Sequence, residues 1–196
     1  MRIFVALEIP NSVRERIAQF IEDVRELAGN ARWVRPESLH VTLKFIGEKS
    51  PTEVEKIKHM LAGISGRQRF DVAFRGCGFF PSAKSARVLW VGIEENPRLK
   101  NLANAVVEAV SKPGIPREEH EFNPHLTLAR AGSGAPQRLR SDRNNRVFAK
   151  LQERLAKMGN FEFGAMPASE FILFQSKLSP SGAHYTALAR FPLAQS

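Results

Sequence analysis

A four-residue motif that occurs twice limits the folds open to this chain more than any other feature. The first copy reads HVTL from His40, and the second reads HLTL from His125. Polar and apolar residues alternate in both copies, which is the pattern of a half-buried β-strand. Because successive side chains on a strand point to opposite faces, each histidine shares a face with its threonine, Thr42 or Thr127. The sequence therefore predicts two strands that each present an imidazole and a hydroxyl on one face.

The segments around the two copies follow the same order along the chain. A strand at 2–8 precedes a helix that begins near Pro10, and the first motif follows 30 positions after this proline. A strand at 86–93 precedes a helix that begins near Pro97, and the second motif follows 28 positions after it. Self-similarity on this scale indicates an internal duplication.

Further elements complete both halves. The pattern predicts a helix at 51–64, a strand at 69–80, a helix at about 145–158 and strands at about 161–175 and 183–191. We expect an α+β fold with two lobes, whose antiparallel-rich sheets face a central cleft about a pseudo-twofold axis. The chain would form one bilobal domain, 1–196, from pseudo-repeats at about 1–83 and 84–196.

Composition is that of a globular protein. Of the 196 residues, 43% are hydrophobic and 25% charged, and no apolar run reaches the roughly 18 residues that a membrane helix needs. Glu8 and Pro10 interrupt the N-terminal apolar segment, unlike a secretory signal. Cys77 is the only cysteine, which excludes an internal disulfide and fits a reducing compartment. We expect a cytoplasmic monomer with no membrane partner.

The charge balance favours a polyanionic partner. The chain has 29 Lys and Arg against 20 Asp and Glu, a formal net charge of +9. Such a charge neutralises phosphates and releases their counterions, although it also serves solubility in general. The expected partner is RNA or a cyclic nucleotide. A loop-like segment at 131–146 could guide RNA or simply be solvated, and it carries Arg138, Arg140, Arg143 and Arg146.

Only two of the five histidines stand out. His59, His120 and His184 have no counterpart elsewhere in the chain, and we expect them to be structural or surface residues. His40 and His125 occupy equivalent positions of the inferred repeat. Packing alone does not explain a titratable side chain there, since an apolar residue would pack better.

The residue types of the motif favour acid–base chemistry. Zinc sites need three or four ligands, whereas each motif supplies one nitrogen, so neither a metal nor a cofactor is expected. No serine-nucleophile elbow or Walker loop is present. Two facing histidines suit a pair in which one takes a proton from the attacking group and the other gives one to the leaving oxygen. Thr42 and Thr127 would donate hydrogen bonds to a phosphate between them. The spacing leaves open which histidine is acid and which is base.

Two cations near the motifs are candidate phosphate contacts. Strand alternation puts Lys44 on the face of His40, where it could contribute electrostatically or be a solvated lysine. Alternation puts Arg130 on the face opposite His125, unless the strand bulges or ends at Ala129. We still favour Arg130 as a phosphate contact.

These motifs resemble those of the two-histidine (2H) phosphoesterases. The resemblance is closer to the bacterial and archaeal RNA 2',3'-cyclic phosphodiesterases, once called 2'-5' RNA ligases. Similar segments span nearly the whole chain: RIFVALEIP at the start, LHVTLKFIGE at 39–48, GCGFFP at 76–81, RVLWVGI at 87–93 and FNPHLTLAR at 122–130. The doubled motif with its flanking Gly47 and Arg130 is the specific part of the match.

The resemblance implies a bilobal fold and a reaction. A 2',3'-cyclic phosphate at an RNA 3' end would be hydrolysed to a 2'-phosphomonoester without a metal. By the same resemblance, His125 would be the general base that activates water and His40 the general acid that protonates the 3' oxygen. Some members also join tRNA halves through a 2'-5' linkage, the reverse of this chemistry.

Other functions compete with this one. An RNA-binding module without turnover would need no histidines, and both motifs are intact in this chain. A cyclic phosphodiesterase could also act on a small nucleotide such as an ADP-ribose cyclic phosphate.

Overall fold

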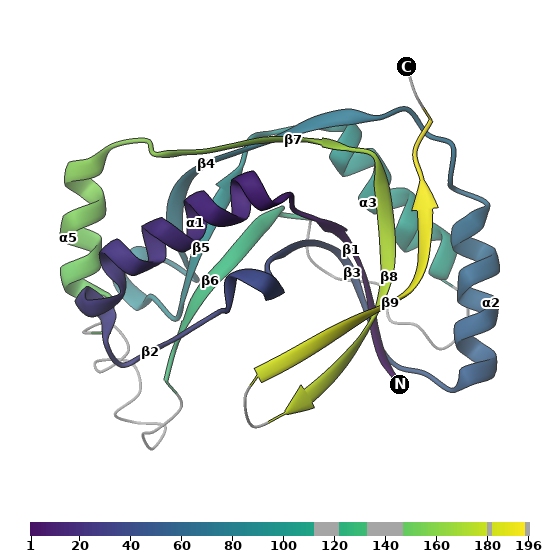
Figure 1. Cartoon of the computed structure of the whole chain (residues 1–196), viewed down its shortest axis with the longest axis horizontal. Coiled ribbons are helices and arrows are strands. Elements are labelled where there is room, and N and C mark those ends of the chain that lie inside the picture. Colours follow the sequence, from purple (N-terminus) through teal and green to yellow (C-terminus); the bar gives the residue numbers. More distant parts are fainter. Residues whose placement is uncertain (112–121, 133–146, 180–181, 195–196) are drawn as a thin grey trace.

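The computed structural model describes residues 1–111, 122–132, 147–179 and 182–194 (Figure 1). The strands are β1 (Arg2–Glu8), β2 (Ala31–Trp33), β3 (His40–Glu48), β4 (Phe70–Phe80), β5 (Val88–Ile93), β6 (His125–Ala131), β7 (Glu162–Ala168), β8 (Glu170–Ser179) and β9 (Gly182–Pro192). The α-helices are α1 (Asn11–Val24), α2 (Pro51–Ala62), α3 (Pro97–Val110) and α5 (Ala149–Met158), and short 3-10 helices are η1 (Arg25–Ala28), η2 (Pro36–Ser38) and η3 (Ala83–Ser85).

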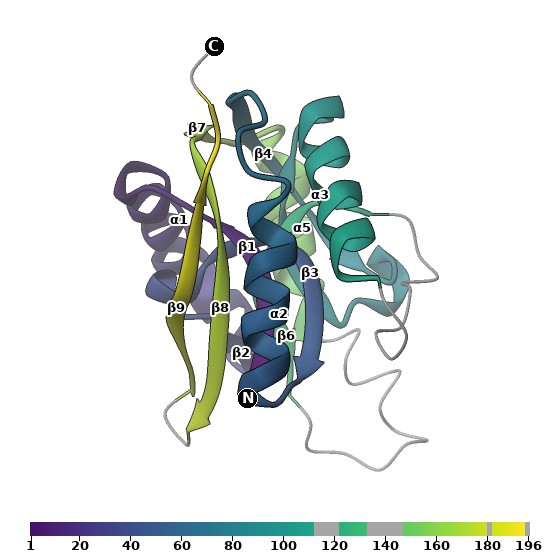
Figure 2. The ribbon, with the colours of Figure 1, turned by 90° about the vertical axis from the view of Figure 1, so that its right-hand side faces the viewer.

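Two antiparallel sheets carry the two motifs. Sheet A has the strand order β3-β1-β8-β9, and sheet B has the order β2-β6-β5-β4-β7 (Figures 1 and 2). The first motif opens β3 in sheet A, and the second opens β6 in sheet B. This arrangement confirms the α+β fold with two antiparallel sheets.

The two sheets exchange strands between the halves of the chain. β4 from the first half lies in sheet B between β5 and β7, while β8 and β9 from the second half lie in sheet A beside β1. β7 and β8 are separated only by Ser169, so this stretch passes from sheet B into sheet A. Neither lobe is therefore built from one contiguous stretch of sequence.

The helix starts follow from local sequence signals. Ser50 and Glu53 form a capping box at the start of α2, in which each side chain accepts a hydrogen bond from the other's backbone N–H. The Asn96 side chain accepts hydrogen bonds from the backbone N–H groups of Arg98 and Leu99 at the start of α3. Both helices have proline at the first position, where the missing N–H costs nothing.

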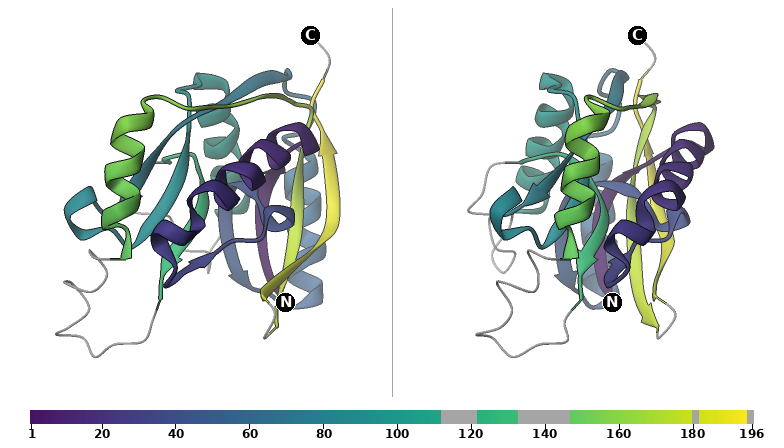
Figure 3. Two further views of the ribbon diagram at one scale, coloured as in Figure 1. Left: turned by 60° about the vertical axis from the view of Figure 1, so that its left-hand side comes forward. Right: turned by 90° about the vertical axis from the view of Figure 1, so that its left-hand side faces the viewer.

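One main core joins the helices to the sheets. The apolar face of α1 contributes Val13, Ile17, Phe20, Ile21 and Val24 to this core. α5 packs against η1, the continuation of α1 (Figure 3). On the opposite face of sheet A, a separate small cluster is formed by Phe4, Ala6, Ile172 and Phe174. Among the described residues, no helix is long and apolar enough to cross a membrane.

A bulge interrupts both motif strands at the same position. Leu43 is skipped in the pairing of β3 with β1, and Leu128 is skipped in the pairing of β6 with β5. An extra residue in one strand reverses the alternation beyond it. The side chains that follow each motif leucine consequently occupy the faces opposite to those that strict alternation predicts.

Candidate active site

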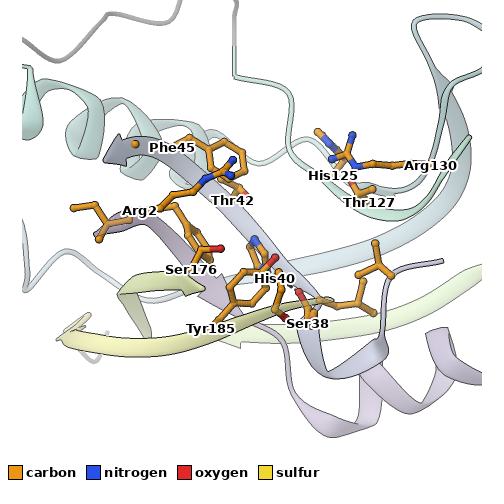
Figure 4. Close-up of a pocket in the computed structure, with 16 residues that line it drawn as sticks. Arg2, Ser38, His40, Thr42, Phe45, His125, Thr127, Arg130, Ser176 and Tyr185 are labelled. Carbon is orange, nitrogen blue, oxygen red and sulfur yellow. Dashed lines mark hydrogen bonds between the residues drawn. The ribbon is translucent and has the colours of Figure 1, made fainter. Parts of the chain in front are cut away.

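The two motifs meet at one pocket of about 360 Å³ between the sheets (Figure 4). Both histidines and both threonines line this pocket, as the motif spacing predicts. Arg130 also lines it, so the structure gathers five of the six predicted site residues. The other residues that line it include Arg2, Phe4, Val34, Ser38, Phe45, Ser176 and Tyr185.

Each imidazole is tied to the chain just before its own strand. His40 Nδ1 lies 2.8 Å from the carbonyl oxygen of Ser38, and His125 Nδ1 lies 2.8 Å from that of Asn123. Because a carbonyl oxygen only accepts, Nδ1 must be the donor in both bonds. In a neutral ring, Nε2 is then unprotonated and able to take a proton. The two histidines thus present the same nitrogen for reaction.

Aromatic rings hold both imidazoles in similar frames. The His40 ring lies 4.7 Å from the Phe4 ring and 5.0 Å, edge-on, from the Tyr185 ring. The His125 ring lies 5.0 Å, edge-on, from Phe80 and 6.5 Å from Trp90. Such packing restricts the rotation of each imidazole and supports its orientation.

Glycine makes room for the aromatic frame of His125. The Trp90 indole lies against the backbone of β4, where a Cβ at Gly78 would overlap it. The segment GCGFFP thereby supplies both this gap and Phe80. The sequence did not lead us to predict Phe80 and Trp90 as site residues. The one sequence feature that indicates this packing is the Gly-x-Gly spacing directly before two phenylalanines in GCGFFP.

The pocket is electropositive. Arg2 and Arg130 reach it from different sheets, and among its described lining residues there is no Asp or Glu. Burial raises the pKa of the Tyr185 hydroxyl, and the two arginines partly oppose this shift. Both guanidinium groups therefore act on the same region of the pocket. The arrangement favours an anionic ligand.

Burial also sets the protonation of His40. Desolvation lowers the pKa of His40 below its ordinary value, and the hydrogen bond to Ser38 only partly opposes this. Burial therefore favours the neutral imidazole. A phosphate anion beside the ring would favour the charged form again.

The prediction that Lys44 faces the cleft is wrong. Lys44 is only 3% exposed and does not line the pocket, because the bulge at Leu43 turns it to the buried side. Phe45 takes its place at the pocket and is 58% exposed. Strict alternation puts Phe45 on the face opposite His40, so Phe45 was not predicted to line the pocket.

The same bulge explains why Arg130 reaches the pocket. Ala129 turns to the buried side after Leu128, as Lys44 does after Leu43, and Arg130 returns to the face of His125. Figure 4 shows Arg130 and His125 among the residues that line the pocket. Arg130 and Phe45 thus occupy equivalent positions of the two motif strands.

The other candidates lie elsewhere. His59 and His184 are exposed and do not line the pocket. His120 and the arginines of the predicted loop (Arg138, Arg140, Arg143 and Arg146) lie outside the described residues. Within the described ranges, no group of three or more His, Cys, Asp or Glu is arranged to hold a metal ion.

A family model described as LigT like Phosphoesterase matches residues 7–90 and, a second time, residues 91–185. The chain belongs to the LigT-like phosphoesterases. The double match also confirms the duplicated unit predicted from the repeated motif.

Several relatives of this LigT-like chain match it over nearly its whole length. An RNA 2',3'-cyclic phosphodiesterase of Archaeoglobus fulgidus is 33% identical over 191 residues, which cover 97% of this chain and 99% of the relative. An RNA 2',3'-cyclic phosphodiesterase of Methanothermobacter thermautotrophicus is 29% identical over 194 residues, which cover 98% of this chain and 99% of the relative.

Solved structures with similar folds cover nearly the whole chain. A protein of Thermus thermophilus has a TM-score of 0.79, 28% identity and full coverage of both chains. The LigT of E. coli complexed with 3'-AMP has a TM-score of 0.77 and 26% identity, covering 99% of this chain and 98% of that one.

Proposed function

We propose that this LigT-like phosphoesterase hydrolyses 2',3'-cyclic phosphates at RNA 3' ends to 2'-phosphomonoesters, without a metal. One observation carries the proposal: two histidines, each anchored through Nδ1, line one electropositive pocket from opposite sheets. The names of the relatives point to the same substrate. A cytoplasmic, monomeric protein remains the sequence prediction.

The two histidines suit an in-line displacement at phosphorus. Such a reaction needs the attacking and leaving oxygens on opposite sides of the phosphorus atom. His125 Nε2 takes a proton from water, whose oxygen forms the new bond to phosphorus. The bond from phosphorus to the 3' oxygen breaks, and protonated His40 gives its Nε2 proton to that oxygen. The products are a 2'-phosphate and a free 3' hydroxyl, and this assignment of roles follows the family resemblance.

Three further side chains would stabilise the charge that develops on phosphorus. The hydroxyls of Thr42 and Thr127 would donate hydrogen bonds to the non-bridging oxygens, where negative charge accumulates. The Arg130 guanidinium could add a bidentate, charge-assisted contact to the same group. All three line the pocket together with the histidines.

Phe45 offers a surface for the nucleobase. Its ring is exposed although the residue is large and apolar, and it lines the same pocket as the histidines. A base can stack on an aromatic ring whatever its sequence identity. Phe45 would therefore hold the terminal base on the sheet A side.

The decisive experiment is product analysis on an oligoribonucleotide that ends in a 2',3'-cyclic phosphate, in the presence of a chelator. We expect hydrolysis and retention of the phosphate on the 2' oxygen. A requirement for added metal would contradict the metal-free step, and a 3'-phosphate product would contradict the assigned leaving oxygen. Binding without turnover would support the RNA-binding alternative instead.

Ligation in the reverse direction rests on a specific feature of the site. A 5' hydroxyl can replace water, in which case His125 takes its proton and His40 again protonates the departing 3' oxygen. Because both histidines present Nε2, they can exchange these roles when the 2'-5' linkage is cleaved in the opposite direction. Adding an RNA with a 5' hydroxyl to the assay tests this, with a 2'-5' linked product expected. An ADP-ribose cyclic phosphate in place of RNA tests the small-nucleotide alternative.

A further inference from the structure

Arg32 lies beside Arg130 on the cleft face of sheet B. The two residues are direct partners in the antiparallel pairing of β2 with β6, so their side chains project from the same face. On either side of Arg32, Ala31 and Trp33 pack against the main core, which turns Arg32 to the cleft. Both arginines are exposed.

This pair of like charges is not neutralised by its neighbours. Neither the Arg32 nor the Arg130 side chain forms an ion pair or a hydrogen bond with another of the described residues. Like charges directly opposite each other on adjacent strands are destabilising. The pair is therefore suited to a ligand that brings more than one negative charge.

Arg32 lies at the rim of the pocket rather than inside it. Val34, two residues further along the same stretch, lines the pocket, whereas Arg32 does not. Arg130 lines the pocket together with both histidines, where the reacting phosphate of the proposed function would lie. Arg32 is thus placed one side chain further out, where a second phosphate of the same ligand would lie.

We propose that Arg32 binds the phosphodiester that precedes the terminal nucleotide, and so selects RNA ends over cyclic mononucleotides. This inference rests on the proposed function, whose reacting phosphate Arg130 would hold. A guanidinium group suits this task because its donors match two phosphate oxygens at once. The pocket then recognises two successive phosphates with two adjacent arginines.

A series of three substrates isolates the second phosphate. Adenosine 2',3'-cyclic phosphate carries one phosphate, its 5'-phosphorylated form carries two, and the dinucleotide ApA with a 2',3'-cyclic end carries the diester itself. For Arg32→Gln, we expect kcat/KM on the last two to fall about tenfold more than on the first, as for one charged hydrogen bond. The loss should lie mainly in KM.

Two matched variants separate a local contact from a general loss of charge. Arg16→Gln removes the same charge from an exposed position of α1, away from the pocket, and should leave the substrate ratio as in the wild type. Arg32→Lys keeps the positive charge but loses the paired donors of the guanidinium group. It should retain part of the preference for substrates with a second phosphate. A wild-type ratio in Arg32→Gln overturns the inference, as does an equal shift in Arg16→Gln.

A binding measurement keeps this inference separable from the catalytic proposal. Affinities for adenosine 2'-phosphate and for ApA with a terminal 2'-phosphate need no turnover. Loss of the dinucleotide preference in Arg32→Gln supports the inference even if no substrate is hydrolysed, in which case only the proposed function fails. An unchanged preference overturns the inference even if hydrolysis is fast.

Discussion

The two imidazoles share an anchoring geometry but have different neighbours. His40 packs between Phe4 and Tyr185, while His125 packs beside Phe80 and Trp90. A tyrosine stands at the first site where a phenylalanine stands at the second. This difference gives the two nitrogens unequal surroundings, although both are held through Nδ1.

Removal of either imidazole should abolish most of the activity. For His40→Ala and for His125→Ala, we expect kcat to fall by roughly 10²–10⁴-fold, the contribution of one positioned acid or base. The assay is hydrolysis of an RNA 2',3'-cyclic end, with circular dichroism to verify the fold. His184→Ala, at an exposed position outside the pocket, is the matched control. Full activity in both site variants would refute the paired mechanism.

The lowered pKa of His40 should make stability depend on pH. In the unfolded chain this imidazole takes up its proton near its ordinary pKa of 6.5, whereas in the folded protein it does so at lower pH. Between these two values the unfolded state holds more protons, so the free energy of unfolding falls as pH falls through the window. Below the folded pKa, this contribution stays constant.

Denaturant unfolding at a series of pH values below 7 measures this effect. We expect the wild type to lose stability more steeply through the window than His40→Gln, which has no imidazole at this position. If the free energy of unfolding varies with pH in the same way for both proteins, His40 takes up its proton alike in the folded and the unfolded state, and the prediction is wrong.

At the scale of the strand, the bulges decide which side chains meet the substrate. One skipped leucine in each motif strand exchanges the faces of the next two residues. Arg130 and Phe45 thereby reach the pocket, and Lys44 enters the buried side. A shift of one residue thus changes the chemistry of the whole cleft.

The bulges predict opposite effects for two cations. Arg130→Ala should lower kcat/KM by about 10²–10³-fold, as for the loss of a transition-state donor, with little change in stability because the residue is exposed. Lys44→Ala should instead lower the free energy of unfolding by about 1–3 kcal/mol, since a buried group loses its contacts. Parallel kinetics and chemical unfolding check both. The reverse pattern would mean that β3 and β6 pair without these bulges.

Phe45 offers a second test at this scale. Phe45→Ala should raise KM by about tenfold, within the roughly 1–3 kcal/mol that one stacked base is worth, while Phe45→Trp retains the stacking. Steady-state kinetics on an RNA cyclic end measure both variants. An unchanged KM in Phe45→Ala would remove this residue from the base-binding surface.

Alternation predicted the motif faces correctly but failed just beyond them. The second motif held a clue, because Leu128 and Ala129 are consecutive apolar residues before Arg130, as in a bulge with two buried side chains. In the first motif, the polar Lys44 concealed the same pattern. The aromatic residues around His40 could not be predicted from the sequence for another reason. Tyr185 approaches His40 only because strands that are distant in the sequence pair in sheet A.

At the scale of the whole molecule, the element order predicted the duplication but not the exchange of strands. The order of elements says nothing about which half supplies the strands that complete each sheet. β4 and β8 complete the sheet of the opposite half, so long-range pairing decided the topology. The predicted repeats at about 1–83 and 84–196 are therefore units of sequence rather than lobes.

Cutting the chain near η3 should show this dependence. We expect fragments 1–84 and 85–196 to lack cooperative thermal unfolding when alone, since each would leave sheet edges unpaired. Mixed together, they should regain the native circular dichroism spectrum and hydrolytic activity. Cooperative melting of one isolated fragment would mean that its half folds without the exchanged strands.

The exchange of strands has the form of a swapped dimer joined into one chain. Two copies of a single repeat, each lending its last strand to the other, would form two equal sheets around a true twofold axis. Such a dimer would place one histidine from each subunit at a shared cleft. A gene that encoded a single motif could thus have made a complete two-histidine site, and fusion would then have freed the two copies to diverge into Lys44 and Phe45 on one side and Ala129 and Arg130 on the other.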